Sequence, residues 1–390
     1  MSDIRDGNYA ANKTQRLFEI LNKQNNDVIE VICERIDKLH AKDINQLISV
    51  FDYSFQDLSR IKKIIALTTH KTLSEIEKIF TDTARDNVHF ANVFYKYRGL
   101  TRSIETDFAI RQLVKGISGK TQKEFLNLSD TTVVGFLNQH GQFRNIKQSY
   151  YDIIDNAIVS IATGKENYYT AVQKSIESMG ESGLRAKFEG VNARGEPYVY
   201  TRRLDSQVNM NVQDGIRQLS TEIQKQTAQE YGADGVEISA HAICAPDHVN
   251  IQGKQFSNDE FEHLQATLKR PISTMNCRHF AFPIVLGVTK SVYTEKELLE
   301  MEKNSRKAVN YKYPNGKEKQ FTKYDATQHQ RQLETKIRKK KEMQKAYENA
   351  GDKLNVARCK KEIRQLNKEY KDFSLQVGLK PEMKRTKIFI

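Results

Sequence analysis

Five residues in one stretch of the chain have side chains that could bind a metal ion or act in catalysis. His241 and Cys244 lie in the sequence HAICAPDH, which ends at His248, and Cys277 and His279 lie in the sequence NCRH. Thiolate and imidazole are the ligands that Zn²⁺ prefers in structural sites, and the spacings Cys-x3-His and Cys-x-His are compatible with tetrahedral coordination. The sequence therefore allows a structural zinc site whose ligands are Cys244, His248, Cys277 and His279.

Two enzymatic interpretations use the same stretch. Asp247, His248 and His279 could hold a hydrated divalent ion for phosphodiester cleavage, with a histidine as the general base. Arg278 would lower the pKa of the Cys277 thiol and favour a nucleophilic thiolate, but Cys277 begins an apolar run that would bury it. No second cluster of carboxylates accompanies these residues in the sequence, and this disfavours a nuclease.

A structural role is the interpretation that we favour for this stretch. Its apolar residues are too few for a large core, and buried polar side chains must pair with one another or with the backbone. A network of such pairs would hold the two short sequences together. The residues of this structural motif are His241, Asp247, His248, Gln252, Gly253, Asn276, Cys277, Arg278 and His279.

The elements that position the motif form a small α+β module at residues 233–290. Val236–Ala240 has the composition of a short strand. Gln252-Gly253 lies between the runs Val249–Ile251 and Lys254–Phe256 and predicts the tight turn of a hairpin, because glycine readily adopts positive φ. The sequence SNDE that begins at Ser257 is a capping box, which predicts the start of a helix. The apolar run His279–Leu286 predicts a returning strand.

Helical patterns occupy most of the remaining chain. Apolar residues recur every three or four positions in residues 1–150, and again between Val208 and Ile223, as they do on the buried face of a helix. We therefore expect a mainly α protein with a small α+β module, comprising an elongated multi-helix N-terminal region, a central hairpin-containing module and a C-terminal basic helical pair. The expected domains are residues 1–150, 151–232, 233–290 and 291–390.

Basic residues are concentrated at the C-terminal end. Residues 301–390 hold 25 Lys and Arg against 11 Asp and Glu, whereas the first 300 residues hold 37 against 38. This segregation favours contact with a polyanion, since each cation near a DNA phosphate releases a condensed counterion, although a solvated basic helix without a partner is the alternative. Two antiparallel helices would turn a basic face outward, and the predicted DNA-binding residues on it are Lys339, Lys340, Lys341, Lys360, Lys361, Arg364 and Lys368.

Composition argues against several classes of protein. The chain has no apolar run of the roughly 18 residues that a membrane helix needs, and its first residues are too polar for a signal peptide, so we expect no membrane partner. Its four cysteines are widely scattered and do not form a disulfide framework. We therefore expect a reducing compartment.

Four short motifs follow one another at specific spacings in the central part of the chain. They are Ser239-Ala240-His241, Asp247-His248, Gln252-Gly253-Lys254 and Asn276-Cys277-Arg278-His279, and an aromatic and apolar run then leads to Gly287. This order resembles the minor capsid protein 2 family of tailed phages, which is similar to the broader group of Mu F-like head morphogenesis proteins. Relatives often lack a cysteine at the position of Cys244. They also carry a longer, glycine-rich insert in place of the Lys269–Met275 link.

The resemblance implies a virion structural protein that is present in few copies inside the capsid and is assembled in the host cytoplasm. It would associate with the portal protein and the capsid shell through residues 1–230, take part in head morphogenesis, and organise or deliver double-stranded DNA without reading its sequence. It would not be an enzyme, and it would need no cofactor beyond a possible structural zinc ion. A metal-dependent nuclease or other nucleic-acid-processing enzyme is the main alternative, and an intracellular DNA-binding scaffold is another.

Overall fold

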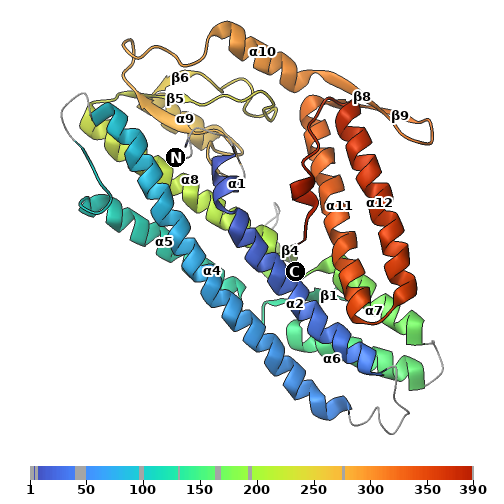
Figure 1. Cartoon of the computed structure of the whole chain (residues 1–390). Coiled ribbons are helices and arrows are strands. Elements are labelled where there is room, and N and C mark those ends of the chain that lie inside the picture. The colour runs from blue at the N-terminus through green and yellow to red at the C-terminus, as the bar shows by residue number, and fades with distance from the viewer. Residues whose placement is uncertain are drawn as a thin grey trace. The chain divides into compact units, whose positions relative to one another are not determined.

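The computed structural model describes residues 4, 8–39, 50–95, 101–130, 132–162, 168–191, 196–274 and 277–388. The chain divides into two compact units, and each unit combines three separate segments. Unit 1 comprises Met1–Arg16, Leu73–Lys123 and Asn209–His329, and unit 2 comprises Leu17–Thr72, Glu124–Val208 and Gln330–Ile390. The prediction of a mainly helical protein with a small α+β module is confirmed (Figure 1). The expected boundaries at residues 150, 232 and 290 stay a prediction.

The helices of unit 1 that precede its sheet in the chain are α1 (Tyr9–Lys13), the second part of α4 (Val50–Tyr95), most of α5 (Phe108–Leu128) and most of α8 (Leu204–Tyr231). Three of them approach closely at Gly215, where an added Cβ would lie 2.6 Å from Phe80 of α4 and 2.9 Å from Thr121 of α5. The apolar residues of α8 that recur every three or four positions are buried, as predicted, and they are Val208, Val212, Ile216, Leu219 and Ile223.

The α+β module of unit 1 is built on a three-stranded antiparallel sheet in the order β6-β5-β7. Its strands are β5 (Gly235–Ile238), β6 (Gln255–Ser257) and β7 (Ala281–Ile284), and α9 (Asn258–Thr267) follows β6. The capping box of α9 is present: the Ser257 hydroxyl accepts a hydrogen bond from the backbone N–H of Glu260, and the Glu260 carboxylate accepts one from the backbone N–H of Ser257. The predicted returning strand is therefore β7, and it pairs with β5.

One detail of the expected hairpin is wrong. Val249–Ile251 does not form a strand, because this segment turns back on itself: the N–H groups of Val249 and Gln252 donate to the carbonyls of Ala245 and His248, respectively. Gly253 has the predicted positive φ, at 71°. The chain then continues into β6, whose partner is β5. The remaining elements of unit 1 are α10 (Glu295–Arg306), β8 (Ala308–Lys312) and β9 (Glu318–Thr322).

Unit 2 contains most of α2 (Gln15–Leu39), the first part of α4, α6 (Ile146–Ala162) and α7 (Tyr168–Ser182). It also holds a four-stranded antiparallel sheet in the order β2-β1-β3-β4. Its strands are β1 (Val134–Leu137), β2 (Phe143–Asn145), β3 (Arg185–Val191) and β4 (Pro197–Arg203). The purely helical reading of residues 1–150 is therefore wrong at β1 and β2, where a turn with Gly141 at φ 72° lets two very short strands pair.

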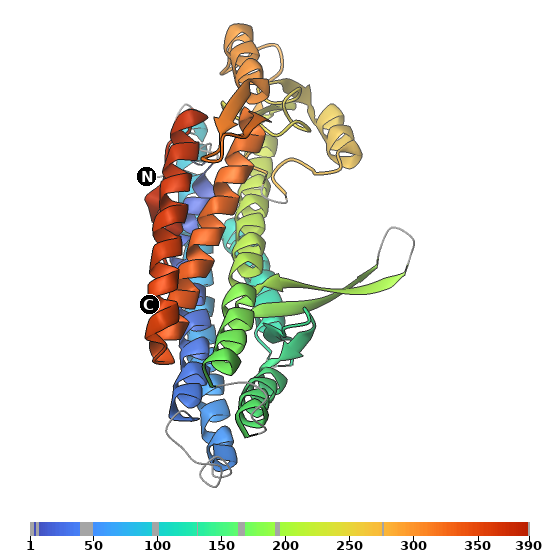
Figure 2. The same cartoon turned by 90° about the vertical axis from the view of Figure 1, so that its right-hand side faces the viewer.

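Strands β3 and β4 form a hairpin that extends beyond the rest of this sheet (Figure 2). β1 pairs with Arg185 and Ala186 alone, at the base of β3. Farther out, the ring of Tyr200 stacks on Phe188 and on Tyr198, with centroids 5.2 Å and 5.3 Å apart. Of these two contacts, the Phe188–Tyr200 pair joins the two strands, and it stabilises the hairpin beyond its pairing with β1.

The predicted C-terminal helical pair is present as α11 (Lys323–Asn349) and α12 (Lys353–Gln376), which run side by side in opposite directions (Figures 1 and 2). Unit 2 contains α12 and the part of α11 from Gln330 onward. Gly351, at φ 70°, ends α11, and the Asp352 carboxylate caps α12 by accepting a 3.0 Å hydrogen bond from the N–H of Asn355. The Tyr370 hydroxyl of α12 donates to Glu334 of α11 at 3.0 Å. A 3-10 turn, η2 (Met383–Thr386), follows.

Candidate functional site

The two cysteine- and histidine-containing sequences meet beside the β5–β7 strand pair. His241 and Cys244 lie in the loop after β5, and Cys277 and His279 lie just before β7. Ser239 joins the two segments: its backbone N–H donates to the carbonyl of Phe280, and its hydroxyl accepts from the N–H of Phe280, both at 2.8 Å. The sheet register therefore sets the position of the whole cluster.

Cys277 lies between two imidazole rings. Its Sγ is 3.4 Å from Nδ1 of His248 and 3.4 Å from Nδ1 of His279. The side chains are almost fully buried, with exposures of 0% for His248, 1% for Cys277 and 3% for His279. One ligand atom from each residue lies within 4.8 Å of the other two, which is close enough for a common metal ion.

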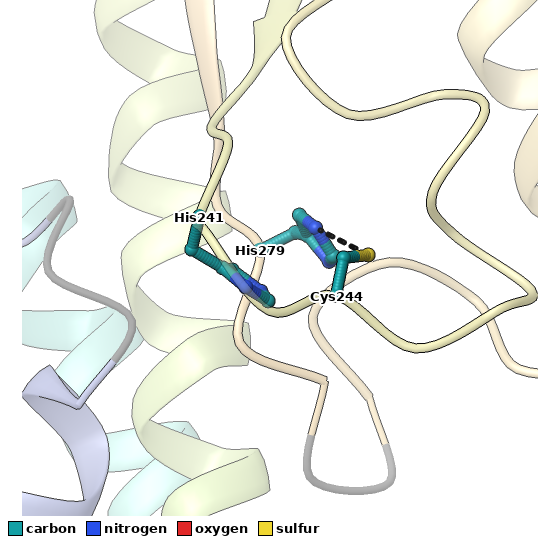
Figure 3. A group of neighbouring side chains, drawn as sticks. All are labelled: His241, Cys244 and His279. Atoms are coloured by element: carbon teal, nitrogen blue, oxygen red, sulfur yellow. Dashed lines mark hydrogen bonds between the residues drawn. The ribbon is translucent and has the colours of Figure 1, made fainter. Parts of the chain in front are cut away.

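Cys244 lies at the opposite edge of the His279 ring. Its Sγ is 3.5 Å from Nε2 of His279, and the ring of His241 stacks on that of His279 with centroids 4.4 Å apart (Figure 3). His241, Cys244 and His279 therefore make a second group of potential ligands. The four residues of the predicted zinc site are neighbours. The two cysteines, however, contact different nitrogens of His279: Cys277 lies at Nδ1 and Cys244 at Nε2.

Burial keeps the groups of this cluster neutral. It lowers the pKa of His279 to about 2 and that of His241 to about 4, and it also lowers the pKa of His248. Burial likewise raises the pKa of Cys244 to about 12, and the pKa of Cys277 rises for the same reason. Neutral imidazole is the form that binds metals, whereas a free thiolate nucleophile is disfavoured here.

Asp247, His248 and His279 do not form a common group of potential ligands among the described residues, although Oδ2 of Asp247 lies 3.8 Å from Nε2 of His248. The Asp247 carboxylate forms a two-point ion pair with Arg270, at 2.7 Å and 3.0 Å. The nearer partner of His248 Nε2 is the carbonyl oxygen of Arg270, at 2.7 Å. Asp247 is partly exposed whereas the imidazoles are buried, so the three side chains do not converge on a point that substrate could reach.

The other motif residues support the loop. The Gln252 side chain is 3% exposed, and its Oε1 accepts from the backbone N–H of His241 at 3.1 Å. Gly253 packs against α10, where an added Cβ would lie 2.2 Å from Cδ2 of Leu298. Arg278 is half-buried, and Asn276 lies outside the described residues.

The predicted DNA-binding residues fall into two groups. The four on α12 are exposed, and they are Lys360, Lys361, Arg364 and Lys368. The three on α11 are half-buried, unlike the expectation that all seven would face outward. Lys340 pairs with Glu362 at 2.8 Å, Lys341 donates to the carbonyl of Thr386 at 2.6 Å, and burial lowers the pKa of Lys339. Lys340 and Lys341 therefore attach α12 and the C-terminal 3-10 turn to α11.

A comparison with protein families decides the class of protein. Residues 7–374 match the family described as phage minor capsid protein 2. The chain belongs to the phage minor capsid protein 2 family. It has no match among the curated proteins or the solved structures that were searched.

Membership of the minor capsid protein 2 family makes the chain a virion component and a structural capsid protein. The resemblance expected from the central motifs is confirmed, and the match extends farther toward the N-terminus than those motifs do. The helices among the described residues of this minor capsid protein lack an apolar stretch of the length that crossing a bilayer requires.

Several residues that support the cluster of the minor capsid protein were not predicted from the sequence. Ser305 of α10 accepts from the backbone N–H of Cys244 at 2.9 Å, and Ser273 donates to the carbonyl of His279 at 3.0 Å. Ser273 also has a positive φ of 67°. A lone serine carries no sequence signal of such a role. The Arg270 partner of Asp247 could have been suspected from its charge alone.

Proposed function

We propose that this minor capsid protein lies inside the phage head, associates with the portal protein and the capsid shell, and contacts packaged double-stranded DNA without reading its sequence. It would be assembled into the particle in the host cytoplasm, take part in head morphogenesis, and help to organise or deliver the genome. The observation that supports the DNA contact is the exposed basic face of α12, on a chain whose first 300 residues are nearly neutral.

The basic face of α12 follows the helix repeat. Lys360, Arg364, Lys368 and Lys371 are exposed and recur at intervals of four, four and three residues, so they form one stripe. At 1.5 Å per residue this stripe is about 16 Å long. B-DNA carries one phosphate per about 1.7 Å of its axis, so a stripe of this length can reach several phosphates.

Charge removal on α12 tests the DNA contact in the full-length chain. Substitution is preferable to deletion of α11 and α12, because buried Glu342 of α11 belongs to the interior of unit 2. We expect the slope of log Kobs against log salt for a random-sequence duplex to fall by about 3 to 4, since each phosphate contact contributes about 0.9. The substituted residues are Lys360, Lys361, Arg364 and Lys368, each changed to Gln.

A control variant removes the same charge elsewhere. It replaces four exposed lysines outside the C-terminal region, namely Lys62, Lys63, Lys123 and Lys147, by Gln. Its salt slope should change by less than about 1. Equal slopes in the two variants would refute the role of α12.

The β3–β4 hairpin is the surface that we propose for contact with the portal protein. Its adjacent residues Tyr198 and Val199 are 45% and 56% exposed, and transfer of their apolar surface from water into an interface would be favourable. The hairpin also lies within residues 1–230, the region expected to dock. Burial of these two side chains against a partner would stabilise the complex.

Coexpression with the portal protein of the same phage tests this contact. We expect the Tyr198→Ser, Val199→Ser double variant to lose copurification with the portal protein while its circular dichroism is unchanged. The Phe55→Ser variant is a matched control, since Phe55 is a large exposed apolar residue of α4 in the same unit. Retention of the portal protein by the hairpin variant would contradict the proposed surface.

A further inference from the structure

Two buried imidazoles direct the same type of nitrogen at one sulfur atom. Nδ1 of His248 and Nδ1 of His279 each lie 3.4 Å from Sγ of Cys277. Whether these contacts are ordinary hydrogen bonds depends on where the imidazole hydrogens lie, because a neutral imidazole has one N–H group and one lone pair. The partners of the other two ring nitrogens decide this.

The hydrogen of His248 is fixed by a backbone carbonyl. Nε2 of His248 lies 2.7 Å from the carbonyl oxygen of Arg270. A carbonyl oxygen can only accept, so Nε2 must carry the hydrogen. Nδ1 of His248 therefore presents its lone pair to Cys277.

The hydrogen of His279 is fixed by the side chain of Gln252. Oε1 of Gln252 accepts from the backbone N–H of His241 at 3.1 Å, which sets the orientation of the amide. The same oxygen lies 3.3 Å from Nε2 of His279, so Nε2 carries the hydrogen. Nδ1 of His279 therefore also presents a lone pair to Cys277.

The group formed by Cys277, His248 and His279 lacks one hydrogen-bond donor. Among the described residues, Cys277 faces both Nδ1 atoms, and its thiol has a single hydrogen, so one buried lone pair is left without a donor. Buried acceptors without a donor are rare. A bound cation would satisfy both lone pairs and the thiolate at once.

We propose that Cys277, His248 and His279 bind one Zn²⁺ through Sγ and the two Nδ1 atoms. For tetrahedral zinc, bond lengths near 2.3 Å to sulfur and near 2.0 Å to nitrogen place the two ligand atoms about 3.5 Å apart, and the observed separations are both 3.4 Å. The carbonyl of Arg270 and the amide of Gln252 are the outer partners that orient metal-binding histidines. Binding releases the thiol proton of Cys277 to solvent, and a water molecule completes the coordination.

The second group of potential ligands does not fit a metal ion in the same way. It would need the lone pair of His279 on Nε2, but that nitrogen carries the hydrogen directed at Gln252. The Cys244 thiol has its own acceptor, the carbonyl oxygen of Ala245 at 3.3 Å. Cys244 is thus a buried neighbour of the site and not a ligand, which makes it a matched control for Cys277.

Metal analysis of the full-length protein, purified without a histidine tag from zinc-supplemented medium, tests the proposal. We expect about one zinc per chain in the wild-type protein and in Cys244→Ser, and a loss of at least tenfold in Cys277→Ser. Absence of zinc from the wild-type protein after incubation with ZnCl₂ would overturn the proposal, as would equal loss of zinc in both variants. Preferential retention of copper over zinc would overturn the choice of metal.

X-ray absorption at the zinc edge tests the ligand set without any variant, so the test survives if Cys277→Ser does not fold. We expect one sulfur atom in the first shell, with nitrogen or oxygen atoms making up the rest. Two sulfur atoms would show that Cys244 also binds the ion and would overturn the three-residue site. A first shell without sulfur would exclude Cys277.

Discussion

Arg203 of β4 and Glu342 of α11 form a two-point ion pair in the interior of unit 2. Nη1 and Nη2 of Arg203 each lie 3.0 Å from a carboxylate oxygen of Glu342, and Nη2 also lies 2.9 Å from Asp205. The side chain of Glu342 is 1% exposed and that of Arg203 is 14% exposed. Although burial by itself lowers the pKa of Arg203, the charges of Asp205 and Glu342 raise it above its ordinary value.

Loss of the Glu342 charge should destabilise unit 2. In Glu342→Gln the Arg203 guanidinium keeps one carboxylate partner instead of two in a buried position, and removal of a buried ionic partner costs about 3 kcal/mol. Urea unfolding of the full-length chain, followed by circular dichroism, measures this change. Exposed Glu348 on the same helix is the control, and Glu348→Gln should change the free energy of unfolding by less than about 0.5 kcal/mol. Equal changes in the free energy of unfolding for Glu342→Gln and Glu348→Gln would show that the Arg203–Glu342 pair does not stabilise unit 2.

Asp205 should make unit 2 sensitive to acid. Burial by itself raises the pKa of this carboxyl, but the Arg203 charge and the hydrogen bonds from Arg203 and Ser206 lower it below its ordinary value. The unfolded chain therefore takes up this proton first as the pH falls, so the stabilisation is present above about pH 4 and is lost below it. Asp205→Asn should reduce the free energy of unfolding at pH 7 and flatten its decline between pH 4 and pH 3. A parallel decline in both proteins would contradict the assignment.

Gly253 should be more sensitive to substitution than Gly316. Both have positive φ, 71° and 82°, so alanine is strained at either position by about 1 kcal/mol. At Gly253 the new Cβ also meets Leu298 at 2.2 Å, whereas Gly316 has open space around it. Thermal unfolding should therefore show a larger loss for Gly253→Ala, and part of that loss should be recovered in the double variant with Leu298→Ala. Equal losses at the two glycines would exclude a role for the contact.

Lys341 and Lys361 should have opposite roles. Lys341 donates to the carbonyl of Thr386, so Lys341→Gln should speed hydrogen exchange in residues 383–388 and leave DNA affinity unchanged. Lys361 is exposed on α12, so Lys361→Gln should weaken DNA binding and leave exchange unchanged. Hydrogen-exchange mass spectrometry and a duplex titration on both variants measure the two effects. Weaker DNA binding by the Lys341 variant would show that α11 is part of the DNA-binding surface.

Local signals in the sequence predicted the elements well. Ser257 caps α9 as the sequence SNDE predicts, because a cap depends on only four consecutive residues. The pairing of β1 with β2 was missed, since two strands of four and three residues carry too little periodicity.

Long-range contacts could not be predicted in the same way. The Arg203–Glu342 pair joins residues 139 positions apart, and no local pattern marks it. The grouping of His248, Cys277 and His279 was predicted from residue type, but which nitrogen of His279 faces which cysteine depends on Gln252 and on the register of β5 with β7. The half-buried positions of Lys340 and Lys341 likewise depend on their contacts with Glu362 and Thr386, respectively.

The interleaving of the two units has a consequence for synthesis on the ribosome. Unit 2 needs Gln330–Ile390 for its interior, and this segment is translated after the other two segments of the unit. The apolar faces of its first segment, Leu17–Thr72, therefore stay uncovered until Gln330–Ile390 has been synthesised. A nascent chain of this kind is a substrate for chaperones, and truncated products should be degraded before they can join a particle.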